Sequence, residues 1–137
     1  MPYESDAALA DDVRRFETAA FTPAEFTHAR HVAVGLWYAA HAPYPEALAR
    51  MRAGLRRFLD AHGVADAYHE TLTVFWMRLL AHVAADEAPR PLYERVNVAL
   101  DRFGSMAPVL AHYRRETAFS DEAKAAWVEP DLRPLPF

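Results

Sequence analysis

Cysteine is absent from the 137-residue sequence, which excludes thiolate metal ligands, thiol nucleophiles and disulfide bonds. A chain without disulfides suits a reducing compartment. The first residues, MPYESDAALADD, carry acidic side chains where a signal peptide carries a basic region followed by an apolar one. We therefore predict a cytoplasmic protein.

Excess positive charge and long apolar runs are also missing. The sequence has 15 lysines and arginines against 19 aspartates and glutamates, a formal net charge of −4. A general polyanion-binding surface is not expected, and neither is nucleic-acid binding. No uninterrupted apolar stretch approaches the ~20 residues that cross a bilayer, so we expect no membrane span.

Glycine is scarce, with four residues, whereas hydrophobic residues make up 53% of the chain. The apolar residues recur at helical spacing, and no strand-like alternation lasts more than a few residues. These patterns predict a single all-α domain over residues 1–137, a compact bundle of five to six helices. Three prolines in the closing stretch EPDLRPLPF predict an extended tail laid over the bundle.

Capping signals place the ends of these helices. Thr22 and Glu25 have the spacing of a capping box, which predicts that the second helix starts at Thr22. Gly63 is predicted to end the third helix as the C′ glycine of a Schellman motif, and Val64 follows it at the C″ position. The sequence predicts six helices. The first begins at a cap at Ser5, and the last is a short helix from a cap at Ser120 through Trp127. The four between them run from Thr22 to about His41, from Pro45 to His62, from after Asp66 to about Ala85 and from Pro91 to Phe103.

Two histidines, His28 and His31, lie one turn apart on the second predicted helix, in the stretch FTHARHVAVGLWYAAHAPY. From His31 to Ala42 this helix carries no formal charge, so we expect protein on all its sides. Both imidazoles then project into the interior, on a side shared with Gly35 and Tyr38. A buried imidazole must meet a hydrogen-bonding group, a water or a metal.

The fourth predicted helix carries a third histidine, His69, beside Glu70. An i, i+3 pair and one imidazole from a facing helix can form a three-ligand metal site, here His28, His31 and His69, with a position left for water or substrate. Iron(II), zinc and copper all accept such ligands, and the sequence does not choose among them. Glu70 is then a ligand or the general base on the bound water.

Three further side chains are predicted to line a substrate pocket beside the histidines: Tyr38, Tyr68 and Thr73. Two alternatives to the metal site stay open, a small-molecule pocket without metal and purely structural histidines. For His69, a satisfied core histidine beside Trp76 is an equally good interpretation. For Glu70, a carboxylate in a first helical turn is stabilised by the helix dipole without any chemistry.

Three motifs, F-x-H-x-x-H at residues 26–31, YHETLT at 68–73 and the closing S-D-E-A…W-V-E-P-D-L-R-P-L-P, resemble a family of small uncharacterised bacterial helical proteins. The resemblance covers residues from about 26 to the end of the chain. It implies a soluble bacterial protein and adds no activity.

Together these features predict a small helical enzyme or ligand-binding protein with a histidine-lined pocket between the second and fourth helices. Metal-dependent chemistry on a small molecule is the more specific hypothesis. The alternative is a helical interaction module, in which the histidines are structural and an aromatic surface binds a partner protein or a second copy of the chain in a homo-oligomer.

Overall fold

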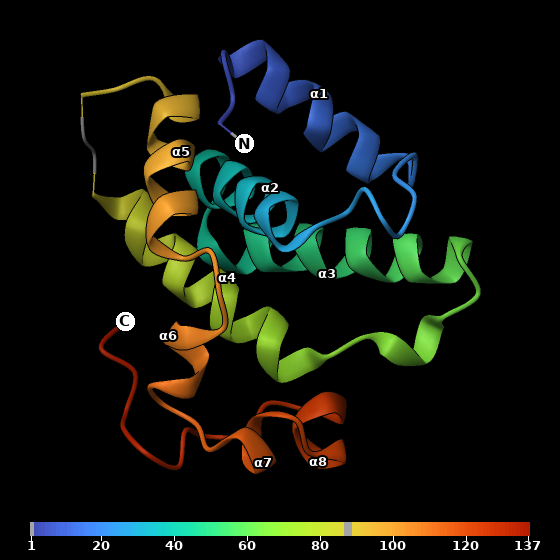
Figure 1. The fold of residues 1–137 in the computed structure, drawn as a ribbon, viewed down its shortest axis with the longest axis vertical. Helices are drawn as coiled ribbons and strands as arrows, with labels where there is room; N and C mark the ends of the chain where they lie inside the picture. Colours follow the sequence, from blue (N-terminus) through green and yellow to red (C-terminus); the bar gives the residue numbers. More distant parts are fainter. Residues whose placement is uncertain (1, 87–88) are drawn as a thin grey trace.

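A computed structural model describes residues 2–86 and 89–137, and it confirms the all-α fold class. Within these residues five long helices form a bundle, and three short helices follow them near the end of the chain (Figure 1). None of the described helices has the length and hydrophobicity needed to span a membrane. The helices are α1 (Asp6–Glu17), α2 (His28–His41), α3 (Tyr44–Ala61), α4 (Glu70–Ala85), α5 (Leu92–Arg102), α6 (Ala107–Leu110), α7 (Arg115–Ala118) and α8 (Asp121–Ala125), with a 3₁₀ turn, η1 (Ala65–Ala67), before α4.

α2 lies at the centre of the bundle, as its lack of charge predicted. It packs against α1, α3, α4 and α5 (Figure 1), and residues 32–36 are all buried. Gly35 brings α2 close to α4, because a Cβ at this position would lie 2.7 Å from Leu80 Cδ1 and 3.2 Å from Met77 Sδ. The absence of a side chain at this position therefore allows the close approach of the two helices.

α4 joins two apolar clusters. Met77 and Leu80 belong to the larger cluster, which α1, α2, α3 and α5 complete. Phe75 and Leu79 belong to the smaller one, which includes residues of α6 and α7 and contacts Phe137 in the C-terminal tail. The predicted tail over the bundle is confirmed by these contacts.

The predicted start of α2 at Thr22 is wrong, although the capping box itself forms. The Thr22 N–H donates to Glu25 Oε1 at 2.8 Å, and the Glu25 N–H donates to Thr22 Oγ1 at 3.3 Å. After one turn the chain breaks, and Thr27 caps α2 by accepting from the Arg30 N–H at 3.4 Å. The Arg30 guanidinium donates to the Glu25 carbonyl at 2.6 Å, so this carbonyl already has a donor outside the helical ladder.

The predicted stop of α3 is confirmed. Gly63 has a φ of 68°, the left-handed conformation that favours glycine. Its N–H donates to the Asp60 carbonyl at 3.1 Å, and the Val64 N–H donates to the Leu59 carbonyl at 2.9 Å. These two bonds are the pair that defines a Schellman motif.

Near the C-terminus the structure is more broken than predicted. Ser5 and Ser120 cap α1 and α8 as expected. α8 ends at Ala125 rather than Trp127, since Ala126 is extended and its carbonyl accepts from the Thr71 hydroxyl at 2.8 Å. The helices α6 and α7 have four residues each, too few to show a periodicity in the sequence.

Candidate functional site

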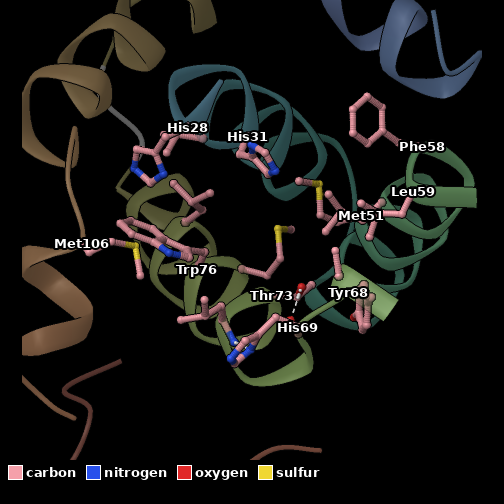
Figure 2. Close-up of a pocket in the computed structure, with 16 residues that line it drawn as sticks. His28, His31, Met51, Phe58, Leu59, Tyr68, His69, Thr73, Trp76 and Met106 are labelled. Carbon is pink, nitrogen blue, oxygen red and sulfur yellow. Dashed lines mark hydrogen bonds between the residues drawn. The ribbon is translucent and has the colours of Figure 1, made fainter. Parts of the chain in front are cut away.

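A cavity of about 380 Å³ lies between α2, α3 and α4 (Figure 2). The segment 67–69, before α4, and Met106, before α6, complete its wall. Most of the lining is apolar and consists of Val32, Met51, Leu55, Phe58, Leu59, Ala67, Leu72, Trp76, Met77, Leu80 and Met106. α3 supplies four of these side chains, and the sequence analysis had not placed this helix at the site.

Five side chains with polar atoms complete the lining: His28, His31, Tyr68, His69 and Thr73. All five are site residues that the sequence analysis singled out, whereas Glu70 and Tyr38 do not line the cavity. No Asp, Glu, Lys or Arg of the described residues belongs to the lining. The interior is therefore apolar, with polarity confined to a few imidazole and hydroxyl groups.

His31 presents an unused ring nitrogen. Its Nδ1 lies 2.9 Å from the Thr27 carbonyl oxygen, which can only accept, so Nδ1 carries the proton of the neutral ring. Every buried side-chain nitrogen or oxygen of the described residues has a partner. Nε2 forms no hydrogen bond with these residues, so we infer that it is accessible from the cavity.

The surroundings of His31 keep its ring neutral. The ring stacks on Phe26, with centroids 4.0 Å apart and an interplanar angle of 25°. Burial is the main effect that lowers the pKa of His31, and the neighbouring His28 lowers it further. At neutral pH, Nε2 is therefore an unprotonated hydrogen-bond acceptor.

His28 connects α2 to the end of α5. Its Nε2 donates to the Phe103 carbonyl at 2.8 Å, across 75 residues of sequence. The ring meets Trp76 edge-on, with centroids 5.0 Å apart and planes at 67°. In the neutral ring Nδ1 is then the acceptor nitrogen. His28 thus lines the cavity and also holds the chain that leads to Met106.

His69 is the N-cap of α4 and not part of its first turn, which corrects the predicted start of this helix. Its Nδ1 accepts from the Leu72 N–H at 3.1 Å, and its Nε2 donates to the Ala118 carbonyl at 2.9 Å. Both ring nitrogens are engaged. Figure 2 shows this imidazole on the other side of the cavity from His28 and His31.

The two hydroxyl groups of the lining also have acceptors already. Thr73 Oγ1 donates to the His69 carbonyl at 2.8 Å. Tyr68 Oη donates to Glu70 Oε1 at 2.6 Å, and the guanidinium of Arg56 lies 4.7 Å from the centre of the Tyr68 ring. These residues shape the wall, and their protons are committed to the protein.

Glu70, predicted as a catalytic base, forms an ion pair between helices instead. Arg52 on α3 donates Nη2–H to Oε2 at 2.7 Å and Nε–H to Oε1 at 3.1 Å. Burial raises the pKa of Glu70, but hydrogen bonds from Arg52 and Tyr68 outweigh it, and the pKa is lowered. A carboxylate with both oxygens engaged and a lowered pKa is a poor proton acceptor. The role of Glu70 is to fasten α4 to α3.

Tyr38, predicted to line the pocket, lies beyond it. Its hydroxyl donates to Glu17 Oε2 at 2.9 Å, and its ring centroid is 6.4 Å from that of Phe16 on α1. Seven residues separate Tyr38 from His31, which places the two on one face but about 10 Å apart along the helix axis. The sequence pattern indicated the face of α2 on which Tyr38 lies, but it could not indicate how far along the helix axis the cavity extends.

The described residues do not assemble the predicted three-histidine metal site. Among them, no group of three His, Cys, Asp or Glu side chains could hold a metal ion. His69 has no free ring nitrogen, and His28 and His31 have one each. Two imidazoles fall short of the three protein ligands typical of a catalytic zinc site.

The methionines are among the site residues that sequence reasoning missed. Met51, Met77 and Met106 all line the cavity, and Met1 is the only other methionine in the chain. Thioether side chains are flexible and polarisable, so they adapt to ligands of varied shape. Their rarity was visible in the sequence, but no periodicity connects residues on three separate segments.

No protein-family model, curated protein or solved structure matches this chain. The resemblance to small bacterial helical proteins therefore stays a prediction. The chemistry of the cavity is what indicates a function.

Proposed function

We propose that this protein binds a small, mainly apolar molecule in the cavity between α2, α3 and α4, and that His31 accepts a hydrogen bond from it. One observation carries the proposal: an apolar cavity of about 380 Å³ whose wall includes a neutral imidazole with an unused acceptor nitrogen. Ligand pockets typically measure ~300–1,000 Å³ and combine an apolar lining with a few orienting polar groups.

The contrast between two histidines supports a binding role for His31. His69 shows what a structural imidazole looks like here, because both of its nitrogens are bonded to the backbone. His31 bonds the backbone through Nδ1 alone. An acceptor left without a protein partner on a cavity wall is available to a ligand.

Metal-dependent chemistry is not part of this proposal, since at most two imidazole nitrogens are free. The ligand is bound non-covalently and makes its contacts with the apolar wall and one acceptor. A cytoplasmic location, a bacterial source and a homo-oligomer stay predictions from the sequence, and the proposal requires none of them.

Tryptophan fluorescence provides the test, because Trp76 lines the cavity. Neutral apolar probes of increasing size, benzene, naphthalene and 1-decanol, are titrated into the protein, and unfolding temperatures are measured in parallel. We expect at least one probe to change the fluorescence and raise the unfolding temperature. In the Trp76→Phe variant the fluorescence change should be lost while the thermal stabilisation remains.

A matched pair of variants on α3 locates the binding. Leu55 lines the cavity, whereas Leu48, two turns earlier on the same helix, does not, and both are half-buried. We expect Leu55→Trp to fill the cavity and abolish binding, and Leu48→Trp to bind as the unaltered protein does. Absence of binding by every probe, or equal binding by both variants, would contradict the proposal.

A further inference from the structure

The absence of charged side chains from the cavity lining restricts the charge of the ligand. Among residues 2–86 and 89–137, no Asp, Glu, Lys or Arg belongs to the lining, and the Arg52 guanidinium is paired with Glu70. Moving a carboxylate or an ammonium group into such a place without a counter-charge is very costly. The neutral state of His31 supplies no positive charge either. The ligand is therefore neutral.

The composition of the wall favours an aromatic ligand over an aliphatic one. Trp76 and Phe58 provide aromatic rings, and three thioethers come from Met51, Met77 and Met106 (Figure 2). Aromatic pairs and sulfur–aromatic contacts both add to the gain from area burial alone. An alkyl chain obtains neither gain.

The volume of the cavity sets the size of the ring system. An apolar cavity of ~150 Å³ is large enough to bind benzene. This cavity, at about 380 Å³, is about two and a half times that size, which leaves room for a second ring. Two fused rings therefore match the available space.

The hydrogen-bonding groups of the lining call for a ligand that donates. The hydroxyl protons of Tyr68 and Thr73 and the Nε2 proton of His69 are already committed to protein acceptors. His31 Nε2 and His28 Nδ1, in contrast, accept no hydrogen bond from the described residues. A hydroxyl group suits this set, because it can donate to His31 and still accept a hydrogen bond.

We infer that the ligand of this cavity is a neutral two-ring aromatic alcohol whose hydroxyl donates to His31 Nε2. This inference rests on the proposed function and specifies the class of molecule that the same site takes. The compound 2-naphthol has the required features and serves as the probe.

Naphthalene and three of its derivatives separate the features of the inference by isothermal titration calorimetry near neutral pH. We expect 2-naphthol to bind about tenfold more tightly than naphthalene, the effect of one additional hydrogen bond of about 1.4 kcal/mol. The ether 2-methoxynaphthalene cannot donate and should bind no more tightly than naphthalene. The anion 2-naphthoate should show no binding. These comparisons use the unaltered protein and do not depend on a variant that folds.

Two histidine variants on α2 assign the hydrogen bond. His31→Phe should remove the advantage of the hydroxyl group, so that this variant binds 2-naphthol no more tightly than it binds naphthalene. His41 is the matched control, because its Nδ1 also bonds the carbonyl four residues earlier, at 2.8 Å, but it does not line the cavity. His41→Phe should therefore bind 2-naphthol normally.

The possible results separate this inference from the proposed function. If 1-decanol binds and no naphthalene derivative does, the proposed function stands and the aromatic inference is overturned. If naphthalene or 2-methoxynaphthalene binds as tightly as 2-naphthol, the hydrogen bond to His31 is overturned. If neither 1-decanol nor any aromatic probe binds, both proposals fail.

Discussion

Replacing Gly35 with alanine tests whether the cavity next to it can take up added volume. The new Cβ would lie 2.7 Å from Leu80 Cδ1 and 3.2 Å from Met77 Sδ. Carbon atoms in favourable contact are about 3.5–4.0 Å apart, so Leu80 must retreat by about 1 Å. Both neighbouring side chains line the cavity and can move into it.

The magnitude follows from two opposing effects. Overpacking a core costs about 1–3 kcal/mol, and replacing a glycine inside a helix returns about 0.5–1 kcal/mol. Because Leu80 and Met77 can shift into open space, the cost should lie at the lower end of this range. We expect Gly35→Ala to lower the free energy of unfolding by no more than about 1 kcal/mol.

Gly54→Ala is the matched control on α3. A Cβ at Gly54 would collide with the ring of Phe16. That ring is fully buried, lies beside Phe26 and Tyr38, and does not line the cavity. Nothing nearby can absorb the displacement, so overpacking should cost about 3 kcal/mol. After the gain in helix propensity, Gly54→Ala should lower the free energy of unfolding by about 2 kcal/mol.

Urea and thermal unfolding of the two variants measure the difference. We expect Gly35→Ala to unfold about 3–5 °C higher than Gly54→Ala, which corresponds to about 1 kcal/mol for a chain of this size. The displaced side chains should also shrink the cavity and weaken the binding of 2-naphthol. Equal stability losses in the two variants would refute the reasoning, because they would show that the cavity wall does not yield.

Three further predictions concern single interactions. Burial lowers the pKa of His31 below its unfolded value of about 6.5, so the folded state binds fewer protons than the unfolded state and stability should fall as the pH drops below about 6.5. Urea unfolding between about pH 7 and about pH 5 should show a smaller fall in stability for His31→Phe than for the unaltered protein. An identical fall would contradict the assignment. Hydrogen bonds from Arg52 also lower the pKa of Glu70, so the stability that this ion pair contributes should be lost as the pH falls below about 4.5. Glu70→Gln should lower the free energy of unfolding by about 1 kcal/mol at neutral pH and show a shallower acid transition. The buried Thr71 hydroxyl donates to the Ala126 carbonyl at 2.8 Å and accepts from the Val128 N–H at 3.2 Å. Thr71→Val should therefore lower the free energy of unfolding by about 1–3 kcal/mol and speed hydrogen exchange in residues 126–137. Unchanged exchange there would show that this hydroxyl does not hold the tail.

The helices could be predicted from the sequence because their signals are local. The stop at Gly63 depends on residues within one turn, and the caps at Ser5 and Ser120 each satisfy a backbone N–H three residues away. The start of α2 was wrong for a related reason. Thr22 and Thr27 both act as caps, and the choice between them depends on Arg30, whose guanidinium also pairs with Asp12 on α1 at 3.1 Å. A tertiary contact therefore decides a boundary that local spacing leaves open.

The site residues could be predicted as a group but not in their roles, because the roles depend on partners far away in the sequence. Glu70 has the position of a general base until Arg52, 18 residues earlier, is seen to hold both its oxygens. His69 has the position of a metal ligand until the Ala118 carbonyl, 49 residues later, is seen to accept a hydrogen bond from its Nε2–H.

The difference between His28, His31 and His69 lies in hydrogen bonding and not in residue type or placement. All three line one cavity. Both ring nitrogens of His69 form hydrogen bonds within the protein. One nitrogen of His28 forms a hydrogen bond to a residue 75 positions away, and one nitrogen of His31 forms a hydrogen bond to the carbonyl four residues earlier. Replacing His28 therefore breaks a tertiary bond that a ligand cannot replace, but His31 gives up only a local bond. For this reason His31 is the position where loss of binding can be separated from loss of folding.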